Sequence, residues 1–189
     1  MSRAKYKGVA FQLVTALAIA SLGLPSDAAE SRLQAPPFNL PFDPKKPGKT
    51  YTFNVKVTDP FVYEVSLRFF ITRPSKYSHF FDRVSVEESK RLHAILGGAV
   101  LVAPGSWLEV GVPAKLFIQI LTSPENKLLL SELVDHPKTA ATYMGRYATL
   151  AQSKLSAGVY TVRVEYLEGS PDLEPLYAEI SFAKAHRGK

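Results

Sequence analysis

The stretch TYTFNVKVTDPFVYEVSLRFFI, residues 50–71, decides the fold class of this chain. Over residues 50–57, apolar and polar side chains alternate, and the same alternation returns over residues 63–71 after a turn at Asp59–Pro60. A period of two is typical of antiparallel strands with one buried and one wetter face. Two such strands joined by a short turn predict either a β-hairpin or a corner between two sheets.

The rest of the chain carries similar short segments. Further strand signals lie at residues 107–110, 115–121, 146–150, 159–167 and 177–182. Residues 128–134 are apolar enough for a strand or a helix, and residues 135–150 suggest a loop that leads into the strand at 146. Seven or eight short strands without a βαβ rhythm predict an all-β fold, an immunoglobulin-like antiparallel β-sandwich.

One short helix is predicted over residues 85–96. Ser85 can cap it, and Glu88, three residues later, completes a capping box. Gly97 then stands at a position where glycine commonly ends a helix.

Residues 155–164, LSAGVYTVRV, resemble the approach to the penultimate strand of immunoglobulin-like sandwiches. Gly158 would allow the tight turn, and the Tyr160 hydroxyl could bond back to the loop backbone, as in a tyrosine corner. We therefore assign both residues a structural role.

The N-terminus has the three parts of a secretory signal peptide: basic residues, an apolar run over 9–24 and small residues before Ala29. A retained membrane anchor is the alternative, but the run is shorter than a span needs. We expect a signal peptide (1–28), a proline-rich linker (29–48), one sandwich domain (49–184) and a basic tail (185–189). The mature protein is then periplasmic.

Charge and cysteine content narrow the classes of partner. The formal net charge is +6, of which +2 lies in residues 1–28, leaving +4 spread along the mature chain. Nucleic-acid binding usually needs a concentrated basic face, so we expect none. The chain has no cysteine, which excludes disulfides and lipid attachment through an N-terminal cysteine.

No catalytic or cofactor motif stands out. His79, Asp82 and His93 are the nearest approach to a metal-binding set, but no fourth ligand accompanies them. We expect neither metal nor cofactor.

Aromatic residues give the strongest functional signal. Core packing does not readily explain Phe70, Tyr77, Phe80 and Phe81, the last three of which lie in the expected loop 73–83. Exposed loop aromatics suit a partner or ligand surface, to which the neighbouring Asp82 and Arg83 would belong. The alternatives are a loop folded over the end of the sandwich, and ion pairing that fixes the helix.

The order of segments resembles the bacterial domain-of-unknown-function family 5625. The resemblance rests on FDPKK (42–46), the aromatic strand 63–70, Asp82–Arg83, KRL (90–92), Gly97–Gly98, GVP (111–113), LFIQI (116–120) and residues 155–164 followed by Leu167 and Leu173. It implies a small exported or lipid-anchored bacterial protein, without a transferable activity.

Three functions follow as hypotheses. The first is a non-enzymatic periplasmic module that binds a protein partner, as an immunity-type protein or an envelope-assembly subunit. The second is a sandwich with a pocket for an envelope glycan or lipid, and the third is a hydrolase with an unrecognised site.

Overall fold

A computed structural model of the chain describes residues 33–71, 85–141 and 146–185. The expected signal peptide and nearly all of the basic tail lie outside these ranges. The described part contains eleven strands, one α-helix and one short 3-10 turn. In chain order these are β1 (Phe38–Phe42), β2 (Thr50–Val57), β3 (Phe61–Phe70), α1 (Val86–Ile95), β4 (Val100–Ala103), β5 (Ser106–Leu108), β6 (Ala114–Thr122), β7 (Leu128–Asp135), β8 (Thr139–Ala141), β9 (Arg146–Leu155), β10 (Gly158–Gly169), η2 (Pro171–Leu173) and β11 (Tyr177–Lys184).

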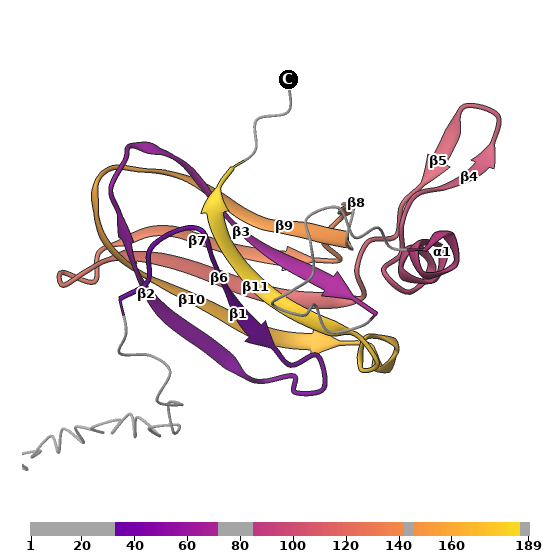
Figure 1. Ribbon diagram of the computed structural model, residues 1–189, viewed down its shortest axis with the longest axis horizontal. Helices are drawn as coiled ribbons and strands as arrows, with labels where there is room; N and C mark the ends of the chain where they lie inside the picture. The colour runs from indigo at the N-terminus through magenta and orange to yellow at the C-terminus, as the bar shows by residue number, and fades with distance from the viewer. Residues whose placement is uncertain (1–32, 72–84, 142–145, 186–189) are drawn as a thin grey trace, which may run out of the picture.

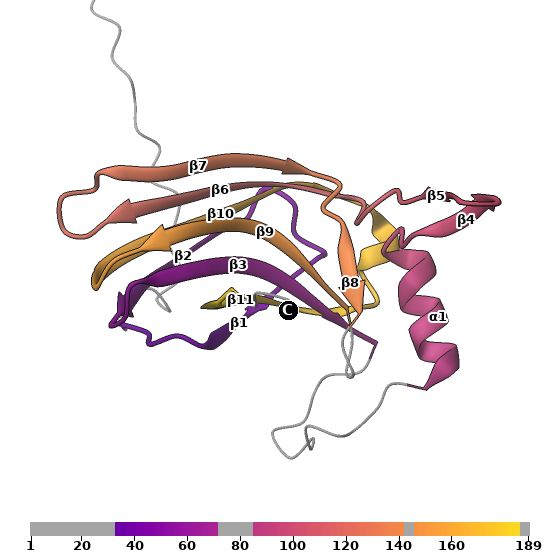
Figure 2. The ribbon, with the colours of Figure 1, turned by 90° about the horizontal axis from the view of Figure 1, so that it is seen from above.

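Nine of the strands form two antiparallel sheets that pack face to face (Figure 2). One sheet has the order β1-β11-β3-β9-β8 and the other β2-β10-β6-β7. Strands β2 and β3 belong to different sheets, so the segment 50–71 forms a corner between the layers rather than a hairpin. Strands β4 and β5 lie outside both layers and, within the part of the chain that the structure describes, pair with each other alone (Figure 1).

Aromatic rings join the two layers at the centre of the core. Phe182 of β11 is fully buried and stacks on Tyr63 of β3, with ring centroids 5.5 Å apart. Phe53 of β2, in the opposite sheet, meets Phe182 edge-on at 6.4 Å. Phe38 of β1 also contacts Phe53, at 5.1 Å. Large rings reaching across the interface explain why alternate residues of these strands are apolar.

The predicted helix forms with its predicted cap. The Ser85 side chain accepts a hydrogen bond from the Glu88 amide, and the Glu88 carboxylate accepts one from the Ser85 amide, both at 3.1 Å. Leu92 is its only fully buried residue and joins the main core. In the described part of the chain, no helix is long and apolar enough to cross a membrane.

The two sheets differ from the sequence prediction in two places. Residues 38–42, expected to be linker, form strand β1, which tolerates Pro41 because it lies at a sheet edge. Residues 139–141 add the short strand β8 within the expected loop. Residues 128–135 form a strand, which is one of the two alternatives that the sequence left open. The two sheets therefore contain nine strands rather than seven or eight.

Candidate binding surfaces

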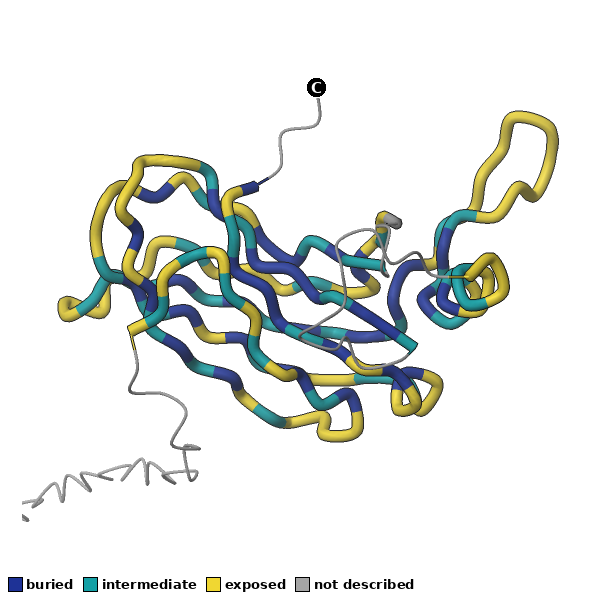
Figure 3. Tube along the Cα trace, in the orientation of Figure 1, coloured by how far each residue is buried: buried dark blue, intermediate teal, exposed yellow. Residues whose placement is uncertain are grey.

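The β4–β5 hairpin projects from the sandwich and is solvent-exposed along its whole length (Figures 1 and 3). Leu101 pairs across the hairpin with Trp107, and these side chains are 56% and 65% exposed. Val100 and Leu108 form the next pair and are also exposed. Because neighbouring strand residues point to opposite faces, the hairpin is apolar on both faces. Contiguous exposed apolar surface is common at interaction sites, so the hairpin is a candidate binding surface.

Glycines fix the base of the hairpin against the body. Gly97, with φ of +59°, follows the helix, and its carbonyl accepts a hydrogen bond from the Gly111 amide at 2.9 Å. A Cβ on Gly97 would collide with the Gly111 carbonyl, and a Cβ on Gly111 would collide with the carbonyl of His136. The backbone segments at Gly97, Gly111 and His136 therefore lie in direct contact, and they hold the two ends of the hairpin against the body.

His93 completes this base from the helix. Its Nε2 lies 2.9 Å from the Ala99 carbonyl, and its ring occupies the space that a Cβ on Gly98 would need. The histidine considered above as a metal ligand thus packs against the chain that enters the hairpin. Within the described ranges, no group of three or more His, Asp or Glu side chains could hold a metal ion.

A second apolar surface lies on the edge strand β7. Leu128, Leu129 and Leu133 are 49%, 43% and 56% exposed. Leu133 is registered with Phe117 of β6, which extends the apolar surface inward from the edge. From Leu130 to Asp135 the strand has no proline or lysine, and in the described part of the chain no other strand pairs with its outer side.

The other sheet edges are better protected. Strand β1 contains Pro41. Gln34 bridges the edge of β2: its amide donates to the Asn54 carbonyl at 2.9 Å, and its carbonyl accepts from the Lys56 amide at 2.8 Å. Strand β9 is partly covered by β8 and exposes Lys154 at its far end. Prolines, charges and covering segments are the usual means of blocking edge-to-edge association. Strand β7 carries the charged residues Glu132 and Asp135 but has no proline and, in the described part of the chain, no covering segment, so we take it as the edge most open to a partner.

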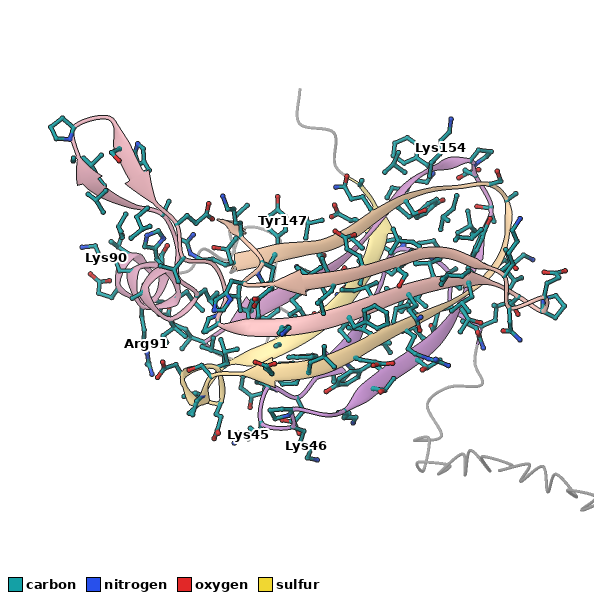
Figure 4. The ribbon with its side chains drawn as sticks, turned by 180° about the vertical axis from the view of Figure 1, so that it is seen from behind. Lys45, Lys46, Lys90, Arg91, Tyr147 and Lys154 are labelled. Carbon is teal, nitrogen blue, oxygen red and sulfur yellow. The ribbon has the colours of Figure 1, made fainter. Side chains whose placement is uncertain are left out.

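A pocket of about 570 Å³ lies between the β1–β2 loop and the connection from β10 to β11. Lys45 and Lys49 line it from the loop, and Lys45 appears in Figure 4. Glu174, Tyr177 and Glu179 line it from the opposite side.

Two buried tyrosines hold the pocket's loop in place. The Tyr51 hydroxyl accepts a hydrogen bond from the Asp43 amide at 2.8 Å, and the Tyr166 hydroxyl donates to the Pro44 carbonyl at 3.2 Å. Burial raises the pKa of both phenols, so both remain neutral at physiological pH. Residues 42–45 thus form a fixed wall of the pocket.

Of the six residues predicted to bind a partner, only Phe70 lies in the part of the chain that the structure describes. Phe70 points away from the main core cluster, as expected, but is only 5% exposed, with the Arg68 guanidinium 5.5 Å from its ring centre. The ring is therefore covered rather than open, and its role in binding stays a prediction. Tyr77, Phe80, Phe81, Asp82 and Arg83 lie outside the described residues.

The tyrosine predicted to be structural makes the bond its position suggests. The Tyr160 hydroxyl donates to the Ser156 carbonyl at 2.8 Å. The ring lies beside Gly158, where an added Cβ would be in close contact with it.

Sequence reasoning missed the hairpin and the pocket. It interpreted residues 107–110 as one more strand of the sandwich, because periodicity does not distinguish an exposed strand from a buried one. A signal was nevertheless available: residues 94–108 contain no charged side chain and include a Pro104–Gly105 turn. The pocket left no comparable signal, since its walls come from segments more than 120 residues apart.

Comparisons with known proteins add fold and family. A Sulfurospirillum deleyianum protein of known crystal structure has 16% identity and a TM-score of 0.58, over 80% of this chain and 98% of its own. A Paenibacillus barengoltzii β-glucosidase has 11% identity and a TM-score of 0.29, over 79% of this chain and 10% of its own. The Bacillus thuringiensis delta-endotoxin Cry8Ea1 has 8% identity and a TM-score of 0.30, over 77% of this chain and 18% of its own. Both are too distant to support an argument. No curated protein matches. The family model matches residues 39–184, and the chain thus belongs to the domain-of-unknown-function family 5625.

Proposed function

We propose that this protein is a non-enzymatic interaction protein of the bacterial cell envelope, exported to the periplasm, and that a protein partner binds the β6–β7 edge of its sandwich. An envelope-assembly subunit and an immunity-type protein are two forms such a module takes. The signal-peptide pattern in residues 1–28 supports the compartment. The proposal includes an immunoglobulin-like class for the sandwich, supported by the Tyr160–Ser156 hydrogen bond.

The open β7 edge carries the proposal. An edge strand presents unpaired backbone amides and carbonyls along one side, and a partner's strand can pair with them. On β7 this edge adjoins the exposed Leu129 and Leu133 and the partly exposed Phe117. Backbone pairing would supply affinity, and the leucines would supply an apolar contact for the partner's alternate side chains.

A second function has one observation in its favour. The pocket beside Tyr177 combines a half-exposed aromatic ring with two lysines and two glutamates. A small number of polar groups around a concave surface is typical of ligand sites. Such a pocket would suit an envelope glycan, and Tyr177→Ala would then abolish glycan binding without affecting the protein partner.

The test compares two aspartate variants of equally exposed leucines, Leu133 on β7 and Leu101 on the hairpin, both 56% exposed. Mature wild-type protein should retain a specific protein from detergent-solubilised envelope extract. Leu133→Asp should lose this protein while its thermal midpoint stays near that of the wild type, and Leu101→Asp should keep it. A partner retained equally by Leu133→Asp would contradict the assignment of this edge.

Protection of backbone amides gives an independent measurement. If a strand pairs with β7, hydrogen exchange at Ser131, Leu133 and Asp135 should slow in the complex. Exchange slowed only elsewhere would place the partner on another surface.

A further inference from the structure

We propose that the β4–β5 hairpin is a membrane-contact element that docks on a bilayer surface carrying anionic headgroups. This contact is separate from the protein contact proposed on β7. It would be reversible and would leave the sandwich in water, with only the hairpin entering the lipid.

The distribution of apolar side chains is the first argument. A hairpin that covers a protein surface usually needs one apolar face, yet this hairpin has apolar side chains on both. Leu101 and Trp107 share one face, while Val100 and Leu108 share the other, and all four are about half exposed or more. Lipid surrounds an inserted element on every side and can therefore accommodate both faces.

The length of the hairpin suits shallow insertion. The four residues of β4 span roughly 13 Å at about 3.3 Å per residue. Interfacial elements typically bury about 5–10 Å at the boundary between headgroups and acyl chains. Among the described residues, no strand lies beside the outer backbone edges of β4 and β5, and these edges could not be satisfied deep in hydrocarbon. At the interface, water and headgroups remain available to them.

Charge is arranged around the hairpin as an anionic surface requires. Residues 94–108 carry no charge, and the helix just before them exposes Lys90 and Arg91, whose side chains stand out from α1 in Figure 4. The nearest following acid, Glu109, pairs with Lys138 at 3.8 Å. Lys90 and Arg91 lie in the middle of α1, one turn nearer the hairpin than Glu87 and Glu88 in its first turn. Basic residues beside an inserted apolar segment strengthen binding to anionic lipids.

Trp107 both supports the proposal and reports on it. Tryptophan is enriched at membrane–water interfaces, and this is the only tryptophan in the chain. The tryptophan fluorescence of the protein therefore comes entirely from the hairpin. Mature protein is mixed with vesicles of phosphatidylcholine containing about one third phosphatidylglycerol, chosen for their anionic surface. The Trp107 emission should shift to the blue, and the protein should sediment with the vesicles.

Three variants sharpen the test. Leu101→Asp should weaken vesicle binding about tenfold or more, because it places a carboxylate in the inserted face. Leu133→Asp should leave vesicle binding unchanged. Replacing both Lys90 and Arg91 by Gln should lower affinity for the anionic vesicles about fivefold per residue and remove their advantage over pure phosphatidylcholine.

The outcomes separate this proposal from the one for β7. Absence of a blue shift, or binding that survives Leu101→Asp, overturns membrane docking whatever happens at β7. Capture of an envelope protein that requires Leu101 rather than Leu133 assigns the hairpin to a protein partner and overturns both assignments. Vesicle binding that depends on Leu101, without any partner that depends on Leu133, overturns only the β7 proposal.

Discussion

The sandwich body and the hairpin use the same kinds of residue with opposite results. In the body, Phe53, Tyr63 and Phe182 are buried where the two sheets face each other. In the hairpin, Leu101 and Trp107 pair across strands, but both are exposed, since no second layer among the described elements covers them. Burial in this molecule depends on whether a strand has a facing layer, more than on the apolarity of its sequence.

This difference separates stability from function. Apolar burial stabilises a fold by roughly 25 cal/mol per Å² removed from water, and the hairpin removes little of its apolar area. Its residues therefore contribute little to the folded state of the monomer. Apolar side chains that face solvent at no gain in stability are the ones we assign to binding.

The largest predicted effect tests this separation directly. Phe182→Ala should lower the free energy of unfolding by about 3–5 kcal/mol, because it leaves a cavity between the sheets and removes the stack on Tyr63. Leu101→Ala should change it by less than about 0.5 kcal/mol, as expected for an exposed site. Chemical denaturation of both variants measures the difference. Similar losses for the two would mean that the hairpin packs on the body in solution.

A smaller effect should appear at the joint between the two regions. Gly111 and Gly48 both have φ of +86°, but a Cβ on Gly111 meets the His136 carbonyl whereas a Cβ on Gly48 meets nothing within 4 Å. Gly48→Ala should therefore cost about 1–2 kcal/mol from backbone conformation alone. Gly111→Ala should lower the free energy of unfolding by more than Gly48→Ala does, since the His136 segment must also shift.

Denaturation midpoints and hydrogen exchange distinguish these two glycines. We expect faster exchange of the Gly111 amide, which donates to Gly97, only in Gly111→Ala. Equal losses of stability in the two variants would show that the stacked segments at the hairpin base adjust freely.

The alternation of Thr50–Val57 and of residues 63–71 predicts both strands and the faces that they turn to the main core, although Ser66 and Phe70 on the other face of β3 are buried as well. The cap of α1 is equally local, and the sequence places it correctly at Ser85. Strand β1 was harder to predict, since five prolines between residues 36 and 47 suggest a linker and only its partner β11 makes it a strand. Local sequence signals therefore predict β2, β3 and the helix cap, whereas β1 depends on its pairing with a distant strand.

The positions of the candidate surfaces also depend on tertiary structure more than on local sequence. Whether Trp107 or Leu133 is exposed depends on which strands find a facing layer, and periodicity carries no such information. The covered position of Phe70 shows the converse, because a ring that points away from the core can still be shielded. A charge-free run ending near a Pro–Gly turn was the one local sign of the hairpin.

The hydrogen bond between Tyr160 and Ser156 should contribute less to the free energy of unfolding than either Gly48 or Gly111. Tyr160→Phe removes the bond to the Ser156 carbonyl and should lower stability by about 0.5–1.5 kcal/mol. Tyr177→Phe is the control, because its ring is 49% exposed. The thermal midpoint should fall only in the first variant, and partner binding should be unchanged in both. Lost binding with unchanged stability would reverse the structural assignment of Tyr160.

The smallest effect concerns a surface ion pair that joins the end of β11 to the corner between β2 and β3. Lys184 donates to the Asp59 carboxylate at 2.8 Å, which lowers the pKa of Asp59 below its ordinary 3.8 and raises that of Lys184 above 10.5. A lowered carboxyl pKa favours the fold above 3.8 and loses that contribution as the pH falls through the lowered value. A raised lysine pKa favours the fold below 10.5 and loses it as the pH rises.

Lys184→Met should therefore return the pKa of Asp59 toward 3.8 in an NMR titration. The pair is fully exposed to solvent screening, so the unfolding midpoint at neutral pH should hardly move. Lys138→Met, which removes the longer pair with Glu109 at the hairpin base, should leave the Asp59 titration unchanged. A large loss of stability in Lys184→Met would show that this pair fastens β11 to the β2–β3 corner, and that the body depends on more than its buried layer.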